Sequence, residues 1–406
     1  MKKITLNYLN SFKGLSKEVW WLALITLINR AGTMVIPFLS IYLGDYLKFS
    51  KEQIGTVMIC FGFGSVAGSW IGGKLTDKIG YYKVMVGSLV ATGFFFWGLQ
   101  FLNSFYSFSL GIFLVMMVAD TFRPAVFTAL NVYSKEENKT RSLTLIRLAI
   151  NLGFSAGPAV GGFIIVTAGF SGLFWVDAIT CIIAGLLLLK VLHPKKAKEI
   201  DTHKTENPSS VFSDFPYLVF FLSMVLFSFI FVQLMSTMPS FYKEYHHLSE
   251  DTIGIILGVN GLLIFIFEMP LVKYIEKRNI KNIDSTIIGA ILTTLSFIAI
   301  LFSSYRFESI FTGMLFLTFG EMIAFPFSNR FAMKRAKRGN FGEYMGLYSI
   351  AFSIAHIAGH KSGFESIAHY GYVFTWKLMA IIGAFTVVVL WLLKIILKRE
   401  KNQEAV

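Results

Sequence analysis

Apolar residues in this chain form long, nearly unbroken runs that are separated by short polar segments. A helix rises about 1.5 Å per residue and the hydrocarbon core of a bilayer is about 30 Å thick, so about 20 apolar residues can cross it. The pattern therefore predicts twelve membrane-spanning helices. We expect them at residues 20–43, 53–72, 83–103, 107–132, 142–167, 172–193, 215–241, 252–272, 283–304, 309–330, 342–367 and 373–396.

One connection between the predicted helices differs from the others. Residues 194–214, PKKAKEIDTHKTENPSSVFSD, are polar, charged and contain two prolines. This composition is typical of a linker between domains. The sequence thus predicts an N-terminal six-helix bundle over 1–193 and a C-terminal six-helix bundle over 215–406.

The two halves resemble each other. SKEQIGTVM at 50–58 is similar to SEDTIGIIL at 249–257, and further along Gly157 aligns with Gly359. Transporters built from parallel repeats place their central site between the repeats. We therefore expect an all-α integral membrane protein with twelve transmembrane helices in two pseudo-symmetric six-helix bundles.

The charge distribution indicates how the chain lies in the membrane. The chain has 37 Lys and Arg residues against 24 Asp and Glu, a mean hydropathy of +0.63, and 55% hydrophobic residues. Of the basic residues, 28 lie in segments on the N-terminal side of the predicted membrane and 5 on the opposite side. Basic residues stay in the cytoplasm, so we expect a multi-pass protein of the cell (inner) membrane with both termini cytoplasmic. Topology explains the net charge of +13, and nucleic-acid binding is not expected.

The segment GGKLTDKIGYYK, residues 72–83, joins the second and third predicted helices. It resembles the signature loop of the major facilitator superfamily, Gly-x-Leu-x-Asp-Arg/Lys-x-Gly. The matching positions are Gly73, Leu75, Asp77, Lys78 and Gly80, whereas Tyr81 and Tyr82 stand where the family usually has basic residues. The resemblance covers the whole chain and implies the major facilitator fold and secondary transport.

The resemblance also implies a role for this segment as a conformational latch made by Gly73, Asp77, Lys78 and Gly80. Asp77 would face the start of the eleventh helix, near residues 339–346, when the cytoplasmic side is closed. We expect Gly73 to allow a close approach of helices and Gly80 to permit a tight turn. The alternative is that the segment is only a positively charged turn.

A second motif lies in the fifth predicted helix. GFSAGPAVGG, residues 153–162, resembles the Gly-x-x-x-Gly-Pro-x-x-Gly-Gly element of the antiporter branch. Small residues four apart let helices approach closely, and a proline bends a helix. We expect a helix-packing element made by Gly153, Gly157, Pro158, Gly161 and Gly162. Generic helix packing is the alternative, while the resemblance implies the drug:proton antiporter branch.

Other function classes find little support. The same motif contains Gly-x-Ser-x-Gly, but a nucleophile elbow needs a strand–turn–helix setting, and this stretch lies inside an apolar helical run. The chain has no Gly-x-x-x-x-Gly-Lys-Ser/Thr loop for ATP. Cys60 and Cys181 match no metal or disulfide spacing. We expect neither an enzyme nor a cofactor or metal.

Ionisable side chains inside a bilayer are costly and usually functional. Glu321 in the tenth predicted helix and Asp120 in the fourth are our candidates for proton coupling. Two structural alternatives remain open: an Asp120–Arg123 ion pair, and an interhelical hydrogen bond at Glu321. The candidate substrate-binding residues are Arg30, Arg123, Arg147, Asn329 and His356.

Together these features predict a proton-coupled secondary active transporter that exports small organic molecules by alternating access. The central arginines favour an alternative, a proton-coupled importer of an anionic or zwitterionic solute such as a peptide or organic acid. The expected partners are the solute, protons and the lipid bilayer, and the expected state is a monomer.

Overall fold

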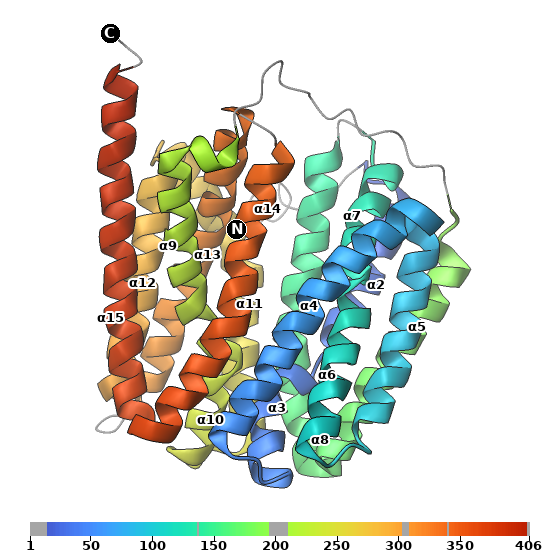
Figure 1. Ribbon diagram of the computed structural model, residues 1–406. Coiled ribbons are helices and arrows are strands. Elements are labelled where there is room, and N and C mark those ends of the chain that lie inside the picture. The colour runs from blue at the N-terminus through green and yellow to red at the C-terminus, as the bar shows by residue number, and fades with distance from the viewer. Residues whose placement is uncertain (1–13, 136–137, 195–209, 303–307, 339–340, 404–406) are drawn as a thin grey trace, which may run out of the picture. The chain divides into compact units, whose positions relative to one another are not determined.

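The computed structural model describes residues 14–135, 138–194, 210–302, 308–338 and 341–403 (Figure 1). The described residues form helices and connections, with no strand among them. In chain order the elements are α2 (Lys17–Ala31), α3 (Val35–Ile41), the π-helix η1 (Tyr42–Tyr46), α4 (Lys51–Ile79), α5 (Tyr81–Leu99), α6 (Phe105–Asp120), α7 (Phe122–Tyr133), α8 (Lys139–Val191), η3 (Val211–Ser213), α9 (Phe215–Phe231), η4 (Val232–Met235), α10 (Thr237–Glu244), α11 (Glu250–Lys277), α12 (Asn282–Leu301), α13 (Glu308–Arg335), η6 (Ala336–Arg338), α14 (Phe341–Ile354), the π-helix η7 (Ala355–Gly359) and α15 (His360–Gln403).

Ten helical segments of the described chain are long and apolar enough to cross a membrane. Two of them, Arg141–Val191 and Tyr344–Glu400, have 51 and 57 residues. Each contains one glycine whose backbone is not helical, Gly169 in α8 and Gly371 in α15. Both glycines lie in gaps that the sequence predicts between separate helices.

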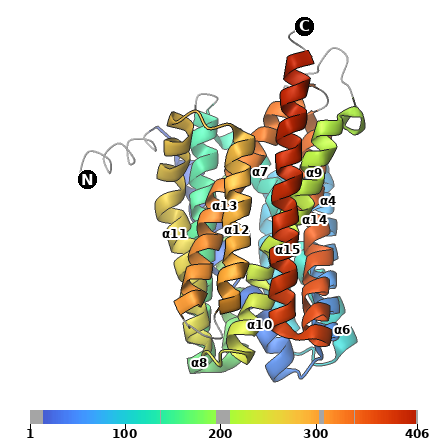
Figure 2. The ribbon, with the colours of Figure 1, turned by 90° about the vertical axis from the view of Figure 1, so that its left-hand side faces the viewer.

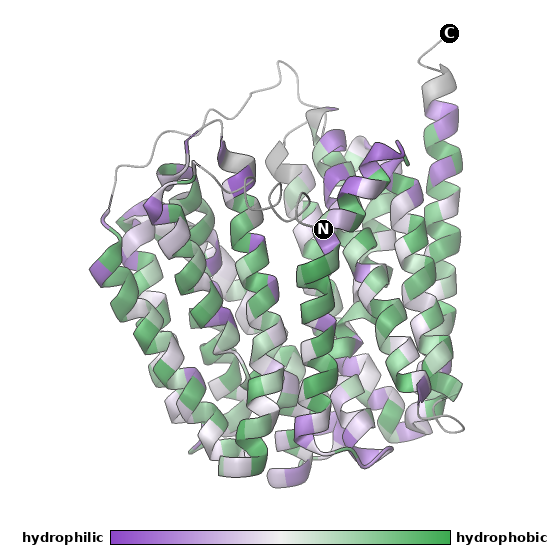
Figure 3. Cartoon of the chain, turned by 180° about the vertical axis from the view of Figure 1, so that it is seen from behind, coloured by the Kyte–Doolittle hydropathy of each residue, from purple (hydrophilic) through white to green (hydrophobic). Residues whose placement is uncertain are grey.

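The polarity of the surface fits a bilayer. Hydrophobic residues dominate the middle of the helices, and hydrophilic residues gather toward the helix ends (Figure 3). Large apolar side chains are exposed, among them Trp70, Phe163 and Ile381, with 63%, 63% and 66% of their surface accessible. Contiguous apolar surface of this kind is unfavourable in water and is stable against hydrocarbon.

The chain forms two compact units. The first consists of residues 1–47, 60–200 and 248–262, and the second of residues 48–59, 201–247 and 263–406. Two long helices are therefore divided between the units. The start of α4 belongs to the second unit and its remainder to the first, whereas the start of α11 belongs to the first unit and its remainder to the second.

Each unit has its own apolar core. In the first unit α8 packs along α2 and α5, and the core includes Leu22, Met85 and Leu188. In the second unit α12 lies against α13 and α15, and α9 lies against α14 and α15 (Figure 2). Tyr217 and Phe227 are in the core of this second unit.

The structure differs from the sequence prediction at several helix boundaries. The first predicted helix is divided into α2, α3 and η1, and the seventh into α9, η4 and α10. The fourth is divided at Thr121, between α6 and α7. The predicted loop 72–83 is mostly helical, because α4 continues to Ile79 and only Gly80 leaves the helical conformation.

Candidate functional site

The first helix of the chain is interrupted between α2 and α3. Asp177, which is buried on α8, accepts hydrogen bonds from the backbone N–H groups of Met34 and Val35, both at 2.9 Å. The first N–H groups of a helix have no partner within the helix, and a carboxylate at this end is stabilised by the helix dipole. Asp177 therefore caps α3 and stabilises the interruption.

Arg30 lies in the last turn of α2, beside the interruption. Its guanidinium carbon is 5.6 Å from the ring centroid of Phe154. The Nε atom of Arg30 is buried and has no hydrogen-bond partner among the described residues. A buried cationic donor of this kind can bind an anionic or hydrogen-bond-accepting group.

The contacts of Asp120 do not include the ion pair with Arg123 that the sequence left open. Asp120 is the last residue of α6, and its carboxylate accepts a hydrogen bond from the Ser65 hydroxyl of α4. Within the part of the chain that the structure describes, no ion pair joins Asp120 to Arg123, and Arg123 is exposed. The sequence pattern places the two side chains on one helical face, but the bond of Asp120 is to Ser65 of another helix. Arg147 is half-buried on α8.

The glycines of GFSAGPAVGG form two closely packed edges of α8. On the first edge, a Cβ atom at Gly153 would lie 2.6 Å from the Cβ atom of Arg30. A Cβ atom at Gly157 would lie 3.2 Å from the Ala31 carbonyl oxygen. A Cβ atom at Gly161 would lie 3.0 Å from the Cβ atom of Met34. These glycines therefore fix the backbone on both sides of the interruption in the first helix.

The second edge of α8 faces the start of α11. A Cβ atom at Gly162 would lie 2.3 Å from the carbonyl oxygen of Glu250. A Cβ atom at Gly254 would lie 2.4 Å from the carbonyl oxygen of Pro158. At these distances the two backbones are in direct contact, and neither position has room for a side chain.

Sequence reasoning did not single out the α11 side of this contact. Gly254, Gly258 and Gly261 recur at helical spacing in GIILGVNG, and the Ser155 hydroxyl donates a hydrogen bond to the Gly258 carbonyl at 2.7 Å. A Cβ atom at Gly261 would lie 2.6 Å from the Cα atom of Ser155. The spacing of small residues was the signal that could have found this surface.

The second unit has an equivalent interruption between α9 and α10. Gln233 spans it: its side-chain nitrogen donates to the Gly359 carbonyl at 2.9 Å, and its side-chain oxygen accepts from the Thr237 hydroxyl at 2.7 Å. Gly359 is the repeat equivalent of Gly157. Both units therefore pack a glycine of this helix against an interrupted first helix. The sequence analysis did not single out Gln233. An amide side chain within an apolar run was the feature that could have identified it.

Glu321 is buried on α13, with 8% of its surface accessible. One turn further along, Phe325 contacts Phe352 of α14, with ring centroids 5.7 Å apart. Since α13 and α14 are consecutive, adjacent and run in opposite directions, residues one turn before Phe325 and one turn after Phe352 lie at the same level. Glu321 and His356 occupy these two positions. Asn329 is half-buried about two turns beyond Glu321.

The predicted latch lies partly outside the described residues. The side chain of Asp77, residues 339–340 and the side chains of 341–343 are not among them. Lys78 is exposed near the end of α4. Gly80 has φ +88°, a conformation that favours glycine, so the predicted requirement for glycine at this turn is confirmed.

The predicted close approach at Gly73 is wrong. None of the described residues lies within 4 Å of the place that a Cβ atom at Gly73 would take. At Gly72, by contrast, a Cβ atom would lie 2.6 Å from the Cα atom of Thr121. The glycine that allows α4 to approach its neighbour is therefore the preceding one, since it lies on the face of α4 that contacts the junction of α6 and α7.

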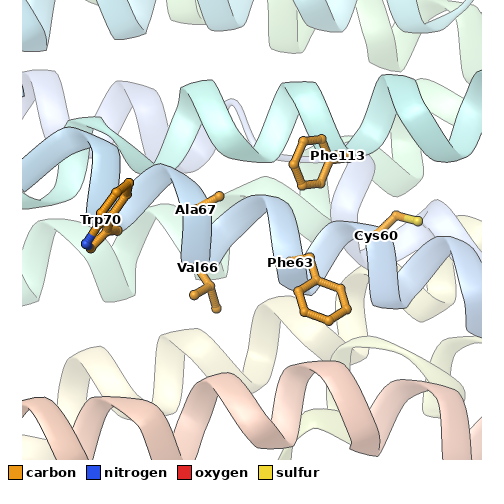
Figure 4. Close-up of a pocket in the computed structure, with 6 residues that line it drawn as sticks. All are labelled: Cys60, Phe63, Val66, Ala67, Trp70 and Phe113. Carbon is orange, nitrogen blue, oxygen red and sulfur yellow. The ribbon is translucent and has the colours of Figure 1, made fainter.

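An apolar hollow of about 500 Å³ lies beside α4 and α6 in the first unit. Five side chains of α4 and Phe113 of α6 line it (Figure 4). The Nζ atom of Lys74 lies 3.7 Å from the ring centroid of Trp70, at one end of this lining. The lining residues offer apolar contact and no charged group. They are Cys60, Phe63, Val66, Ala67, Trp70 and Phe113.

Comparison with known families is decisive for the class of protein. The sequence model of the Major Facilitator Superfamily matches residues 22–360. The chain belongs to this superfamily. It is therefore a multi-pass membrane transporter and not an enzyme, as the sequence analysis predicts.

Relatives within the superfamily transport different solutes. The chain is 24% identical to a Na(+), Li(+), K(+)/H(+) antiporter of Planococcus maritimus, over 92% of this chain and 94% of the relative. It is 20% identical to the multidrug resistance protein MdtH of Aeromonas salmonicida, over 85% and 86% of the two chains. The fold is similar to that of a peptide transporter, POT, in complex with sulfate, with TM-score 0.78, 14% identity and 96% of each chain covered.

Each of the two units of this superfamily member thus holds a set of polar residues within its helices. The first unit holds Arg30 beside the α2–α3 interruption and Asp120 at the end of α6, and the second holds Glu321 and His356 at one level of α13 and η7. Among the described residues, no group of three His, Cys, Asp or Glu side chains could hold a metal ion.

Proposed function

We propose that this chain is a proton-coupled secondary active transporter that exports small organic molecules across the cell membrane by alternating access. The observation that carries the proposal is the presence of the ionisable side chains Arg30, Asp120 and Glu321 within apolar helical segments, because such groups inside a bilayer are costly unless they serve transport. Similarity to a cation/proton antiporter and to a multidrug resistance protein supports proton coupling and export.

We further propose twelve membrane crossings, arranged as six-helix bundles over 1–193 and 215–406 with both termini in the cytoplasm. At about 1.5 Å per residue, a helix of more than 50 residues would be about 75 Å long, over twice the hydrocarbon thickness. The non-helical glycines Gly169 and Gly371 divide the segments Arg141–Val191 and Tyr344–Glu400 into pieces of spanning length. Counted in this way, the ten long segments supply twelve crossings.

Proton coupling is assigned first to Glu321, with Asp120 as the second candidate. A carboxyl group can bind and release a proton, and Glu321 is buried within α13. Asp120 is half-buried and accepts a hydrogen bond from the Ser65 hydroxyl.

The test of proton coupling uses purified protein in proteoliposomes. Transport driven by a pH gradient and solute counterflow without a gradient are measured for the wild type, Glu321→Gln and Glu308→Gln. Glu308 is a matched control, because it is an exposed glutamate in the first turn of the same helix. We expect Glu321→Gln alone to lose gradient-driven transport while it keeps counterflow. Full gradient-driven transport by Glu321→Gln would remove this assignment.

Arg30 supports the second candidate function, the import of an anionic or zwitterionic solute. Its buried Nε atom lacks a partner among the described residues, and the chain shares its fold with a peptide transporter. A solute panel in right-side-out and inverted vesicles separates import from export. It should contain lipophilic cations, organic acids, dipeptides and the ions Na⁺, Li⁺ and K⁺.

Arg30→Gln tests the binding role directly, since it keeps much of the side-chain volume and removes the charge. We expect weaker binding of acidic solutes with little change in thermal stability. Transport confined to permanently cationic lipophiles would exclude a substrate-binding role for the Arg30 charge.

A further inference from the structure

His356 and His360 form a contact that the proposed function does not use. The Nδ1 atom of His356 and the Nε2 atom of His360 are 3.1 Å apart, within hydrogen-bond distance. His360 is buried, with 2% of its surface accessible, and His356 is half-buried. The two rings lie on η7 and the first residue of α15, where the backbone forms a π-helical turn over Ala355–Gly359. Single π-helical turns within α-helices are frequent at functional sites.

The chemistry of this contact limits how many protons the pair can hold. A hydrogen bond between two imidazole nitrogens requires one nitrogen with a hydrogen and one without. The neutral pair satisfies this condition, and so does the pair with one added proton. A second added proton would place two N–H groups and two positive charges against each other. The pair therefore takes up one proton as a unit, and its two rings titrate together.

Neighbouring elements hold the pair in place. The side-chain nitrogen of Gln233 donates to the Gly359 carbonyl, which fixes the π-helical turn against η4. A Cβ atom at Gly359 would lie 2.7 Å from the Cγ2 atom of Val232 and 3.1 Å from the carbonyl oxygen of Phe229. The side of the turn that faces α9 is therefore closely packed and has no room for a side chain at Gly359.

Among the described residues of the elements that pack against η7, few are charged or titratable. From η4 the neutral Gln233 faces the turn. On α15, Lys361 and Glu365 form an ion pair at 3.4 Å. The Tyr348 hydroxyl of α14 is hydrogen-bonded with Ser328. Outside these elements, the register of α13 and α14 set by the Phe325–Phe352 contact places the buried carboxyl group of Glu321 at the level of His356.

We infer that His356 and His360 together bind the coupling proton and exchange it with Glu321. In one direction the carboxylic acid O–H bond of Glu321 breaks and an imidazole N–H bond forms, which leaves a carboxylate beside a singly charged histidine pair. The reverse step restores the neutral acid and the neutral pair. This inference rests on the proposed proton coupling and names the groups that carry it.

The internal repeat indicates why only one unit would hold this site. The positions equivalent to His356 and His360 in the first half are Phe154 and Pro158, neither of which can bind a proton. Phe154 lies instead beside the Arg30 guanidinium. The two equivalent regions therefore have different chemistry, with a cation in the first unit and a pair of proton acceptors in the second.

The first arm of the experiment measures transport. His356→Gln and His360→Gln are compared with the wild type and with His369→Gln in proteoliposomes. His369 is a matched control on α15, because it is exposed and bonds only to the Glu365 carbonyl of its own helix in the contacts described. We expect both pair variants to lose gradient-driven transport and His360→Gln to keep counterflow, whereas His369→Gln should keep both activities.

The second arm measures protonation without transport. The wild type and Glu321→Gln, labelled with ¹⁵N-histidine, are titrated in detergent by NMR. We expect two rings to titrate together with the uptake of one proton, and their midpoint to shift in Glu321→Gln. Independent titration of all rings would overturn the inference, even if the pair variants failed to fold.

The two arms also separate this inference from the proposed function. Gradient-driven transport that persists in both His356→Gln and His360→Gln would overturn the histidine assignment and leave proton coupling intact. A wild type that transports its solute with no response to a pH gradient would overturn the proposed coupling and the histidine assignment together.

Discussion

Gly169 and Gly371 adopt almost the same backbone conformation, with φ and ψ of 70° and −179° in the first case and 77° and 174° in the second. They are related by the same sequence offset as Gly157 and Gly359. This region of backbone space is restricted to glycine almost entirely. The sequence repeat therefore extends to a matching, glycine-dependent break in each half.

Alanine at either break should destabilise the protein. Backbone strain at such positions costs about 1–3 kcal/mol, so Gly169→Ala and Gly371→Ala should each lower the midpoint of thermal unfolding in detergent. Gly87→Ala is the control, because Gly87 is exposed within α5 and has no described atom within 4 Å of its Cβ position. Equal midpoints for all three variants and the wild type would contradict a strained break.

The cap on α3 gives a graded prediction. Asp177→Ala removes both acceptors of the Met34 and Val35 N–H groups, whereas Asp177→Asn keeps one oxygen acceptor. The loss of an N-cap costs about 0.5–2 kcal/mol, so thermal stability should fall from the wild type to Asn to Ala. The measurement is the unfolding midpoint in detergent. An Ala variant as stable as the wild type would show that the interruption does not need the carboxylate.

Asp214 and Arg335 should contribute to the stability of the second unit. The Nε and Nη2 atoms of Arg335 donate to the two carboxylate oxygens of Asp214 at 2.7 Å, while its Nη1 atom donates to Glu400 at 2.6 Å. Hydrogen bonds to charged groups contribute about 1.5–3 kcal/mol, and Asp214→Asn should destabilise by about this amount. The control is Asp284→Asn, because the Asp284–Lys394 pair is more exposed and should contribute less.

The effect of Asp214 should also depend on pH. Burial alone would raise the pKa of Asp214, but hydrogen bonds from Arg335 and Tyr344 outweigh it and lower the pKa below its usual value. An aspartate whose pKa is lower in the folded protein than in the unfolded chain stabilises the folded protein at pH values above the unfolded-chain pKa of about 3.9. This contribution is lost as the pH falls through the pKa of the folded protein. The difference between the wild type and Asp214→Asn should therefore shrink as the pH falls from about 7 to below about 4. Unfolding midpoints measured across that range provide the test, and a constant difference would contradict it.

The two neighbouring glycines of the signature segment should behave differently. Gly72→Leu would force α4 away from the Thr121 backbone and should impair folding or transport, whereas Gly73→Ala meets no described atom within 4 Å. Expression level, thermal stability and counterflow of the two variants are the measurements. If Gly73→Ala were the more damaging change, the added methyl group would have to meet another group in a different conformation of the transporter, as the latch hypothesis requires.

Asp77→Asn should reduce transport under the latch hypothesis and leave thermal stability unchanged.

Much of the helical pattern could be predicted because it depends on local sequence. Apolar runs identify the spans, and the glycines at 169 and 371 lie where the pattern predicts gaps. The repeat and GFSAGPAVGG also pointed to the closely packed edge of α8 that contacts Arg30. These features need only the length of an apolar run or the spacing of small residues.

Other features depend on contacts between residues far apart in the chain. The interruption after α2 is stabilised by Asp177, and that before α10 by Gln233, so no local pattern predicts either one. The α4 helix continues past Gly72 to Ile79, and Gly72 packs on the Thr121 backbone, although the local sequence favours a turn. The His356–His360 contact depends on the π-helical turn, which the apolar pattern also does not reveal.

The division of α4 and α11 between the compact units has a consequence for biosynthesis. The first unit includes residues 248–262, which follow the linker in the chain. A ribosome that has made only residues 1–214 has therefore produced an incomplete first unit, in which the edge of α8 at Pro158 and Gly162 still lacks the start of α11. We therefore expect the N-terminal half to lack these contacts until Leu262 has been synthesised. Its folding during translation is thus completed by the half that is made later.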